Sequence, residues 1–259
     1  MAFIRLDHVS VIFAIYGASS RSLKTRIISA GTGGRIGMDA GNHIVVQALD
    51  DVSMAFEHGD RVALIGHNGA GKTTLLRVLS GIYEPASGRV VVDGQVASLF
   101  DATLGMDYES TGYENILLRG LYLGLTRAKI RARVDEIADF SELGSFLDMP
   151  LHSYSAGMQA RLSFAISTCI EPGILLLDEG IGAGDRAFLE KARKRVAALI
   201  GRVGILVLAS HDEELIRQVC SKAVLMERGR VIMTGPLGPV LMHYNQTAGR
   251  KVSGEQSRR

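Results

Sequence analysis

The chain lacks several features that mark specialised classes of protein. Only two of its 259 residues are cysteines. Both, Cys169 and Cys220, lie in apolar stretches, which is typical of inert, buried thiols in a reducing compartment. No run of 18 apolar residues is present, and the first residues lack the charged and then apolar order of a signal peptide. We therefore expect a cytosolic chain, unless a partner docks it elsewhere.

The charge balance and the histidines argue against two further classes. The 29 basic and 27 acidic residues give a formal net charge of +2, and no aromatic residues alternate with basic ones. We therefore expect no nucleic-acid binding. The seven histidines form no pair at metal-ligand spacing, which gives a zinc site little support. The length allows one large domain or two modest ones, with an ample core.

One segment carries a phosphate-binding pattern. It consists of Gly66, His67, Asn68, Gly69, Ala70, Gly71, Lys72 and Thr73, and Thr74 follows it. A short β-branched run at 61–65 precedes the pattern and predicts a buried strand, and the spacing of 73–79 predicts a helix after it. A strand, a glycine-rich loop and a helix are the context that this pattern requires. The segment therefore predicts nucleotide binding.

The residue types in this segment explain how it would hold a nucleotide. Glycines let the backbone approach the phosphates, and the following helix offers the positive end of its dipole. Lys72 would reach the β- and γ-phosphates of ATP, and Thr73 would supply a hydroxyl for Mg²⁺.

A second motif supplies the acidic residues that ATP hydrolysis needs. The apolar run at 174–177 predicts a strand, and Asp178 and Glu179 follow it directly. Asp178 would bind Mg²⁺, directly or through water, and Glu179 would polarise the attacking water. Alone, this pair would equally suit the start of a helix. Together with the phosphate-binding pattern it predicts an ATP-hydrolysing site.

Two stretches near the N-terminus echo each other. Residues 6–13 begin Leu-Asp-His-Val-Ser and residues 49–56 begin Leu-Asp-Asp-Val-Ser, which predicts a pair of antiparallel strands. Between them lies a basic insertion at about 17–43, rich in serine and glycine, which we expect to be a solvated loop. Alternatively, its positive charges would face anionic lipid headgroups or a phosphate-bearing substrate.

Strand and helix patterns alternate along the rest of the chain. Further strand patterns lie at 89–93 and 95–100, which predict a hairpin, at 204–208, and at 223–233, which predict a last hairpin. A helical insertion is predicted at about 101–165. The order predicts an α/β fold: a P-loop NTPase core of mostly parallel sheet, with an antiparallel β subdomain and an inserted α-helical subdomain. We expect one domain over 1–248 and a disordered basic tail at 249–259.

A third motif identifies a family. Tyr-Ser-Ala-Gly-Met at 154–158 would alone give only a helix N-cap at Ser155. It precedes the acidic pair, however, with 19 residues from Gln159 to Asp178. This order resembles the ATP-binding subunits of ABC transporters, in which a Leu-Ser-Gly-Gly-Gln signature lies just before the second acidic motif. The resemblance extends over about residues 4–242.

The resemblance implies a site shared between two chains. Ser155 and Gly157 match the signature residues that contact the γ-phosphate bound by the other copy, so it implies a homodimer that closes around two ATP molecules. Asp185 matches the family's D-loop aspartate, and His211 matches the switch histidine that senses the γ-phosphate. Phe13 matches the aromatic residue that stacks on adenine, with Tyr16 as the competing candidate.

One family residue is missing from the chain. Relatives usually carry a glutamine that contacts Mg²⁺ after the strand leading into the helical insertion, but residues 99–105 contain none. Asp101 is the nearest polar substitute, so we expect it, or backbone and water, to serve as the metal sensor.

Other departures resemble one branch, the exporters of O-antigen, capsule and teichoic-acid polymers. These are the signature itself, Gly-Asp-Arg-Ala-Phe at 184–188 and the basic insertion. The branch implies a lipid-linked polysaccharide as cargo, multi-span permease subunits as partners, and a place on the cytoplasmic face of the cell membrane. The alternatives are the ATPase subunit of a small-molecule or lipid exporter, and an ABC ATPase without a transport role.

Overall fold

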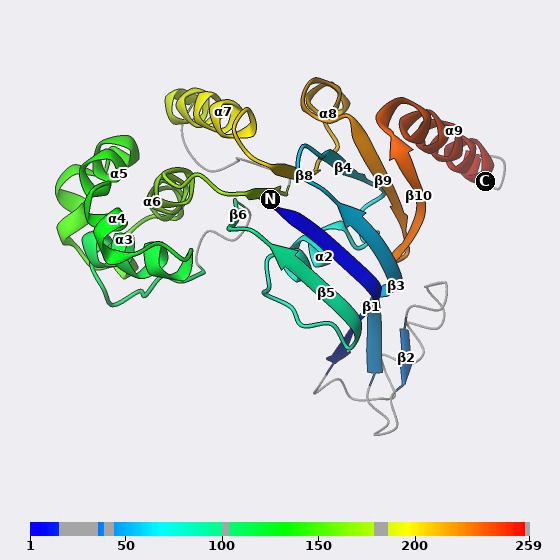
Figure 1. Ribbon diagram of the computed structural model, residues 1–259, viewed down its shortest axis with the longest axis horizontal. Helices are drawn as coiled ribbons and strands as arrows, with labels where there is room; N and C mark the ends of the chain where they lie inside the picture. The colour runs from blue at the N-terminus through cyan, green and yellow to red at the C-terminus, as the bar shows by residue number, and fades with distance from the viewer. Residues whose placement is uncertain (16–35, 39–43, 100–103, 179–185, 257–259) are drawn as a thin grey trace. The chain divides into compact units, whose positions relative to one another are not determined.

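The computed structural model of the protein describes residues 1–15, 36–38, 44–99, 104–178 and 186–256 (Figure 1). The chain forms two compact units, and the backbone passes between them several times. Unit 1 comprises residues 1–2, 57–61 and 93–211, and unit 2 comprises residues 3–56, 62–92 and 212–259.

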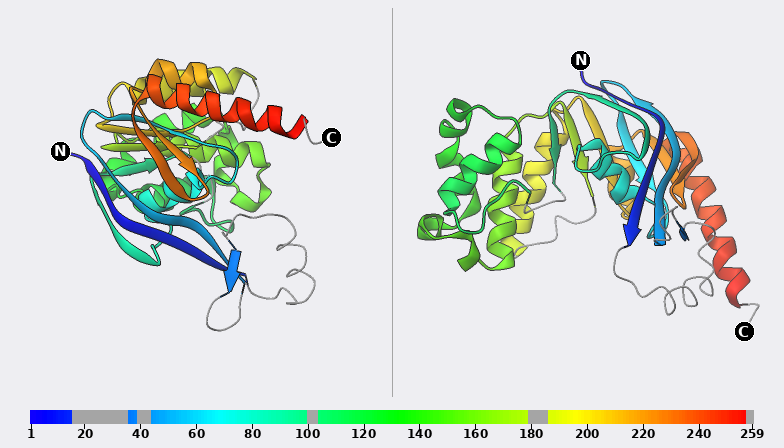
Figure 2. Two further views of the ribbon diagram at one scale, coloured as in Figure 1. Left: turned by 90° about the vertical axis from the view of Figure 1, so that its right-hand side faces the viewer. Right: turned by 90° about the horizontal axis from the view of Figure 1, so that it is seen from below.

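An antiparallel sheet in unit 2 confirms the predicted pairing of the two echoing stretches. Its strands are β2 (Ile36–Met38), β3 (Ile44–Phe56), β1 (Phe3–Ile15) and β5 (Ser87–Asp93), in that spatial order. Leu6 of β1 lies opposite Met54 of β3, and Phe13 lies opposite Val46. Figure 2 shows the two long strands side by side.

The register of β1 and β3 shifts where the two repeats face each other. His8 and Asp51 both have positive φ, at 50° and 54°, which is uncommon for residues with side chains. The contacts between the kinks are reciprocal: the His8 N–H donates to Ser53 Oγ at 2.9 Å, and the Asp51 N–H donates to Ser10 Oγ at 3.1 Å. The serine of each repeat thus accepts the bond from the kinked residue of the other.

The remaining elements of unit 2 include the strand and the helix on either side of the phosphate-binding segment. Strand β4 (Arg61–Ile65) runs parallel to β9 (Lys222–Glu227), which pairs with β10 (Arg230–Pro236) as the predicted last hairpin. Residues 62–65 of β4 are all buried, as expected of an interior parallel strand. The helices of this unit are α2 (Lys72–Leu79), α8 (Glu213–Val219) and α9 (Leu237–Gln256). Helix α9 thus includes residues 249–256, which the sequence analysis assigned to a disordered tail.

Unit 1 contains three parallel strands and a group of helices. The strands are β6 (Val96–Ser98), β7 (Ile174–Leu177) and β8 (Ile205–Ala209), and β7 pairs with both of the others. The helices are α3 (Gly112–Tyr122), α4 (Arg127–Arg131), α5 (Val134–Ser141), α6 (Ala156–Thr168) and α7 (Arg186–Ile200), with 3₁₀ turns at Gly144–Asp148 and Leu151–Ser153. A capping box explains where α3 begins, because Thr111 Oγ1 accepts from the Glu114 N–H while the Glu114 carboxylate accepts from the Thr111 N–H.

The hairpin predicted at 89–100 is wrong. Strand β5 belongs to the antiparallel sheet of unit 2, whereas β6 pairs in parallel with β7. Gly94, with φ of 124°, turns the chain between them. Ala97 in β6 is fully buried, whereas most of β5 is exposed. Two short strands separated by a glycine predict a turn, but the pattern does not specify which partner each strand takes.

Within the described part of the chain, none of the helices is long and apolar enough to cross a membrane. The two cysteines are free and buried, as the sequence predicted. Burial raises the pKa of the Cys169 thiol to about 11, so this sulfur stays protonated at neutral pH.

Candidate nucleotide site

The phosphate-binding segment forms a loop between β4 and α2, as its sequence context predicted. Gly66, Gly69 and Gly71 all have positive φ, at 152°, 78° and 109°, so the loop needs glycine at these positions. The Lys72 ammonium folds back over the loop and donates to the Gly66 carbonyl at 2.6 Å and the His67 carbonyl at 3.3 Å. The lysine is buried, and its charge is therefore held at the loop itself.

The start of α2 suits an anion. Gly71 precedes the helix, no side chain caps it, and its first turn has no acidic residue. The first N–H groups of a helix lack intrahelical partners and carry the positive end of the dipole. The exposed Thr73 and half-buried Thr74 lie in this first turn, so the hydroxyl proposed for Mg²⁺ lies beside the proposed phosphates.

Phe13 lies at the end of β1 in the same unit, with 37% of its surface exposed. Its ring meets the edge of Tyr83 at a centroid distance of 5.1 Å. Tyr83 is held in turn by Arg77 of α2, whose Nη1 donates to the tyrosine hydroxyl at 3.0 Å. No sequence pattern marks Tyr83, which links the adenine candidate Phe13 to the helix that follows the loop. Tyr16, the competing candidate, lies outside the described residues.

Asp178 of the acidic motif and His211, the predicted switch histidine, belong to unit 1. Strand β7 is buried along its whole length, and the half-buried Asp178 follows its last residue. Leu177 of β7 lies opposite Leu208 of the parallel strand β8, and the exposed His211 comes three residues after Leu208. Asp178 and His211 therefore leave the same edge of these parallel strands. Three predicted site residues, Glu179, Asp185 and Asp101, lie outside the described residues.

The signature segment begins helix α6. Ser155 is its N-cap, and the serine Oγ accepts from the Met158 N–H at 3.2 Å. Ser155 and Gly157 line a pocket of about 470 Å³ together with Glu142, Leu143, Phe146, Met158 and Arg161. A side chain at Gly157 would meet only Ser155 Oγ within 4 Å, at 3.8 Å, so the backbone of the first helical turn is open to a ligand. The two residues predicted to contact the γ-phosphate, Ser155 and Gly157, thus both lie at the N-terminus of α6.

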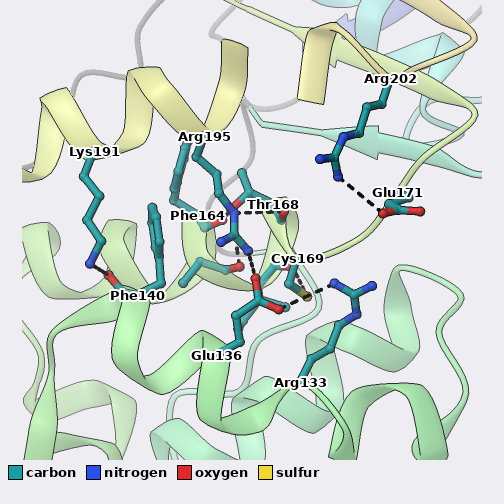
Figure 3. A network of polar contacts seen from close by, with 12 residues as sticks. Arg133, Glu136, Phe140, Phe164, Thr168, Cys169, Glu171, Lys191, Arg195 and Arg202 are labelled. Atoms are coloured by element: carbon teal, nitrogen blue, oxygen red, sulfur yellow. Dashed lines mark hydrogen bonds and ion pairs between the residues drawn. The ribbon is translucent and has the colours of Figure 1, made fainter. Parts of the chain in front are cut away.

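Two cations of α7, Lys191 and Arg195, reach residues of α5 (Figure 3). Arg195 of α7 pairs with Glu136 of α5 and also donates to the Thr168 carbonyl, at the end of α6, at 3.3 Å. Lys191 of α7 pairs with Glu142 at 2.8 Å. Arg161 of α6 lies 3.6 Å from the same Glu142 carboxylate, so this residue joins α6 to α7 beside the signature pocket.

Three phenylalanine rings pack together next to these cations. Phe140, Phe164 and Phe188 lie within 6.0 Å of one another, centroid to centroid. The Arg161 guanidinium lies 4.9 Å from the Phe188 centroid. The sequence analysis did not find this cluster. The sequence feature that could have indicated the cluster is the spacing of Lys191 and Arg195, four residues apart, which places two cations on the same face of α7.

Comparison with known proteins agrees with these motifs. The family model described as ABC transporter matches residues 49–182. The O-antigen export system ATP-binding protein RfbE of Yersinia enterocolitica is 45% identical, over 89% of this chain and 97% of that protein. RfbB of Myxococcus xanthus, with the same description, is 38% identical over 78% of this chain and 46% of its own length. The teichoic acids export ATP-binding protein TagH of Lactococcus lactis is 34% identical over 94% of this chain and 50% of its own length.

Solved structures share the fold. An ATP-binding subunit of an ABC transporter superposes with a TM-score of 0.66, at 21% identity, over 94% of this chain and 93% of its own. A dimeric post-hydrolysis state of an ATP-binding cassette bound to ADP and Pi gives 0.64, at 19% identity, over 90% of this chain and 98% of its own. The predicted α/β cassette fold is therefore confirmed. With a matching family model over half of its length and a nearly full-length relative, the chain belongs to the ABC transporter family, as an ATP-binding and ATP-hydrolysing subunit.

Proposed function

We propose that this protein powers the export of a lipid-linked polysaccharide of the O-antigen, capsule or teichoic-acid type across the cell membrane. The observation that carries the proposal is the 45% identity with an O-antigen export ATP-binding protein over 97% of that protein's length. Relatives that export teichoic acids match at lower identity, which supports a polymer cargo as the common property.

The proposed ATP chemistry gives each predicted residue a role. Lys72 and the amides of residues 66–74 bind the phosphates. Thr73 and Asp178 offer the hard oxygen ligands that Mg²⁺ prefers, and the bound ion would screen the phosphate charge. Glu179 activates the attacking water and His211 senses the γ-phosphate, while Phe13 stacks on the adenine. Asp101 takes the place of the family's glutamine near the metal.

A second copy of the chain completes each site. Ser155 and Gly157 of one copy contact the γ-phosphate held by the loop of the other, and Asp185 lies at the same interface. The open helix N-terminus at Ser155 supports this proposal, because it offers N–H groups and a hydroxyl to an anion. ATP binding then closes the homodimer, and hydrolysis reopens it.

The helical part of unit 1 is the proposed contact with the multi-span permease, at the cytoplasmic face of the membrane. Helix α3 exposes four large apolar side chains, with 37–53% of their surface accessible: Tyr113, Leu118, Leu121 and Tyr122. Such a group on one helix is typical of an interaction surface. Closure of the ATPase dimer would move this surface and drive the permease.

The test measures the ATPase rate of the chain assembled with its permease in proteoliposomes. We expect lipid-linked polysaccharide to raise the rate, and the same lipid carrier without polymer to leave it unchanged. Stimulation by small amphiphiles, with none by the polymer, would overturn the cargo assignment in favour of a small-molecule exporter.

The proposed base is tested separately. The Glu179→Gln protein should bind ATP but fail to turn it over, and should therefore accumulate as an ATP-bound dimer in light scattering. Hydrolysis by this variant at the wild-type rate would show that another group activates the water.

A further inference from the structure

A chain of contacts within unit 2 leads from β3, through the turn between β9 and β10, to the phosphate loop. The Asp50 N–H donates to the Gly229 carbonyl at 2.9 Å, and the Gly229 N–H donates to the Ala70 carbonyl at 2.8 Å. Ala70 lies in the middle of the loop and is 1% exposed. A turn about 160 residues further along the chain thus holds the loop by its backbone.

An ion pair fixes this turn to β3. Asp50 Oδ2 accepts from Arg230 Nε at 2.6 Å and from Nη2 at 2.5 Å, and Gln47 Nε2 donates to the other carboxylate oxygen at 2.8 Å. Arg230 directly follows Gly229, so the pair anchors the neighbour of the residue whose N–H reaches the loop. Asp50 therefore holds the turn twice, once by its backbone and once by its side chain.

The turn and the phosphate loop pack closely against β3. Arg228 and Gly229 both have positive φ, at 51° and 81°, as in the tight two-residue turns that join paired strands. A Cβ on Gly229 would lie 2.6 Å from the Ala48 carbonyl oxygen, and one on Gly71 would lie 3.0 Å from the same atom. The loop and the turn thus both pack directly against the backbone of β3.

The peptide between Ala70 and Gly71 transmits this restraint to the ligand side of the loop. A trans peptide is planar, and its carbonyl and N–H point in opposite directions. Because the Ala70 carbonyl is held toward Gly229, the Gly71 N–H of the same peptide is directed away from the turn. Gly71 is the residue before helix α2, whose N-terminus suits a phosphate.

We propose that Asp50, Gly229 and Arg230 are positioning residues for the phosphate loop: by fixing the Ala70–Gly71 peptide they set the affinity for ATP without touching it. This inference rests on the assignment of the ATP phosphates to the loop at 66–73. The ion pair is suited to such a role, because its arginine side chain is 66% exposed and its aspartate 24%. An arginine as exposed as Arg230 contributes little to global stability through its ion pair, so an effect of its substitution on affinity can be separated from unfolding.

The test compares two arginine variants of the full chain. Arg230→Met breaks the pair with Asp50, and Arg217→Met breaks the pair of Arg217 with Glu213, which lies in the same unit with side chains 54% and 43% exposed. We expect Arg230→Met to raise the dissociation constant and the KM for ATP about fivefold, with kcat within about twofold of wild type. Arg217→Met should leave all three unchanged, and both variants should melt at similar temperatures.

Two further variants make the result decisive. Arg230→Lys keeps the charge and should recover part of the lost affinity, which a purely steric role would not produce. Lys72→Ala tests the loop assignment itself, because wild-type ATP binding by this variant would overturn the proposed site. If Lys72→Ala loses ATP while Arg230→Met and Arg217→Met bind it equally, the site stands and the positioning role is wrong. A fall in kcat at unchanged KM would also overturn that role.

Discussion

The two units hold their nucleotide motifs by different means. In unit 2 the phosphate loop is held by main-chain hydrogen bonds and by glycines packed against backbone atoms of β3 and β9. In unit 1 the signature helix α6 is held by side chains, through cations that converge on α5 and a cluster of phenylalanines. A motif held by backbone contacts should be disrupted by a single added atom at one of those contacts. A motif held by many side chains should lose only part of its stability when one of those side chains is removed.

The largest effect should come from an added methyl group in the loop. Gly66→Ala would place a Cβ 2.2 Å from the Met226 carbonyl oxygen, a backbone atom that cannot move aside. We expect a loss of roughly 3 kcal/mol or more in the free energy of unfolding, together with loss of ATP binding. Urea denaturation and nucleotide titration measure the two quantities.

Gly235→Ala is the matched control, because Gly235 lies in β10 of the same unit and a methyl group added there would meet no other atom within 4 Å. It should change stability by less than about 1 kcal/mol. Equal destabilisation by both substitutions would show that the backbone contact at Met226 is unimportant.

A smaller effect is expected from one of the cations in unit 1. Arg195→Met removes the pair with Glu136 and the bond to the Thr168 carbonyl, from a side chain that is 24% exposed. This should cost about 2 kcal/mol in urea denaturation. Arg202→Met removes only a pair with Glu171 at 3.6 Å from a side chain 72% exposed, and should cost less than about 0.5 kcal/mol. Similar costs would mean that burial does not distinguish the two pairs.

Substitutions at two helix N-caps would distinguish an effect on local stability from an effect on ATP-driven dimerisation. Ser155→Ala and Thr126→Ala each remove an N-cap, of α6 and α4 respectively, and each should cost about 1 kcal/mol. Only the change at Ser155 should weaken ATP-driven dimerisation in light scattering, because only this cap lies beside the proposed γ-phosphate contact. Weakened dimerisation in both variants would reduce the role of Ser155 to that of a helix cap.

The smallest effect concerns an exposed side-chain pair in unit 2. The hydrogen bond and charge of Asp51, with a smaller contribution from Asp7, raise the pKa of His8 above 6.5. Since the folded pKa is the higher one, the stabilisation is fully present below pH 6.5 and is lost as the pH rises through the folded value. The urea midpoint should therefore fall slightly between about pH 6 and about pH 8.5, a window that spans the ordinary pKa of histidine. Asp51→Asn should remove this dependence, and its persistence would assign the effect to another group.

The sequence predicted those parts of the site that lie close together along the chain. The loop at 66–73, its strand and helix, and the cap at Ser155 are each local patterns whose geometry follows from a few neighbouring residues. The order of strands and helices predicted the α/β fold and the family resemblance agreed with it, and the comparisons confirm this fold.

What the sequence did not predict depends on contacts between distant residues. Asp50 and Arg230 are 180 positions apart, and although each lies in a predicted strand segment, no pattern in the sequence pairs the two. The strand at 95–100 was assigned to the wrong partner because alternation marks a strand but not its neighbour. Tyr83 was missed because its link to Phe13 forms only when β1 lies beside the end of α2.

The kinks at His8 and Asp51 have a consequence for the phosphate loop. The N–H of each kinked residue donates to the serine of the opposite repeat, so neither strand can straighten without depriving the other of a partner. Asp51 directly follows Asp50, whose N–H and carboxylate hold the turn at Gly229 and Arg230. If Asp50 positions the loop as proposed, substitutions at Ser10 or His8 would therefore change ATP affinity as well as folding.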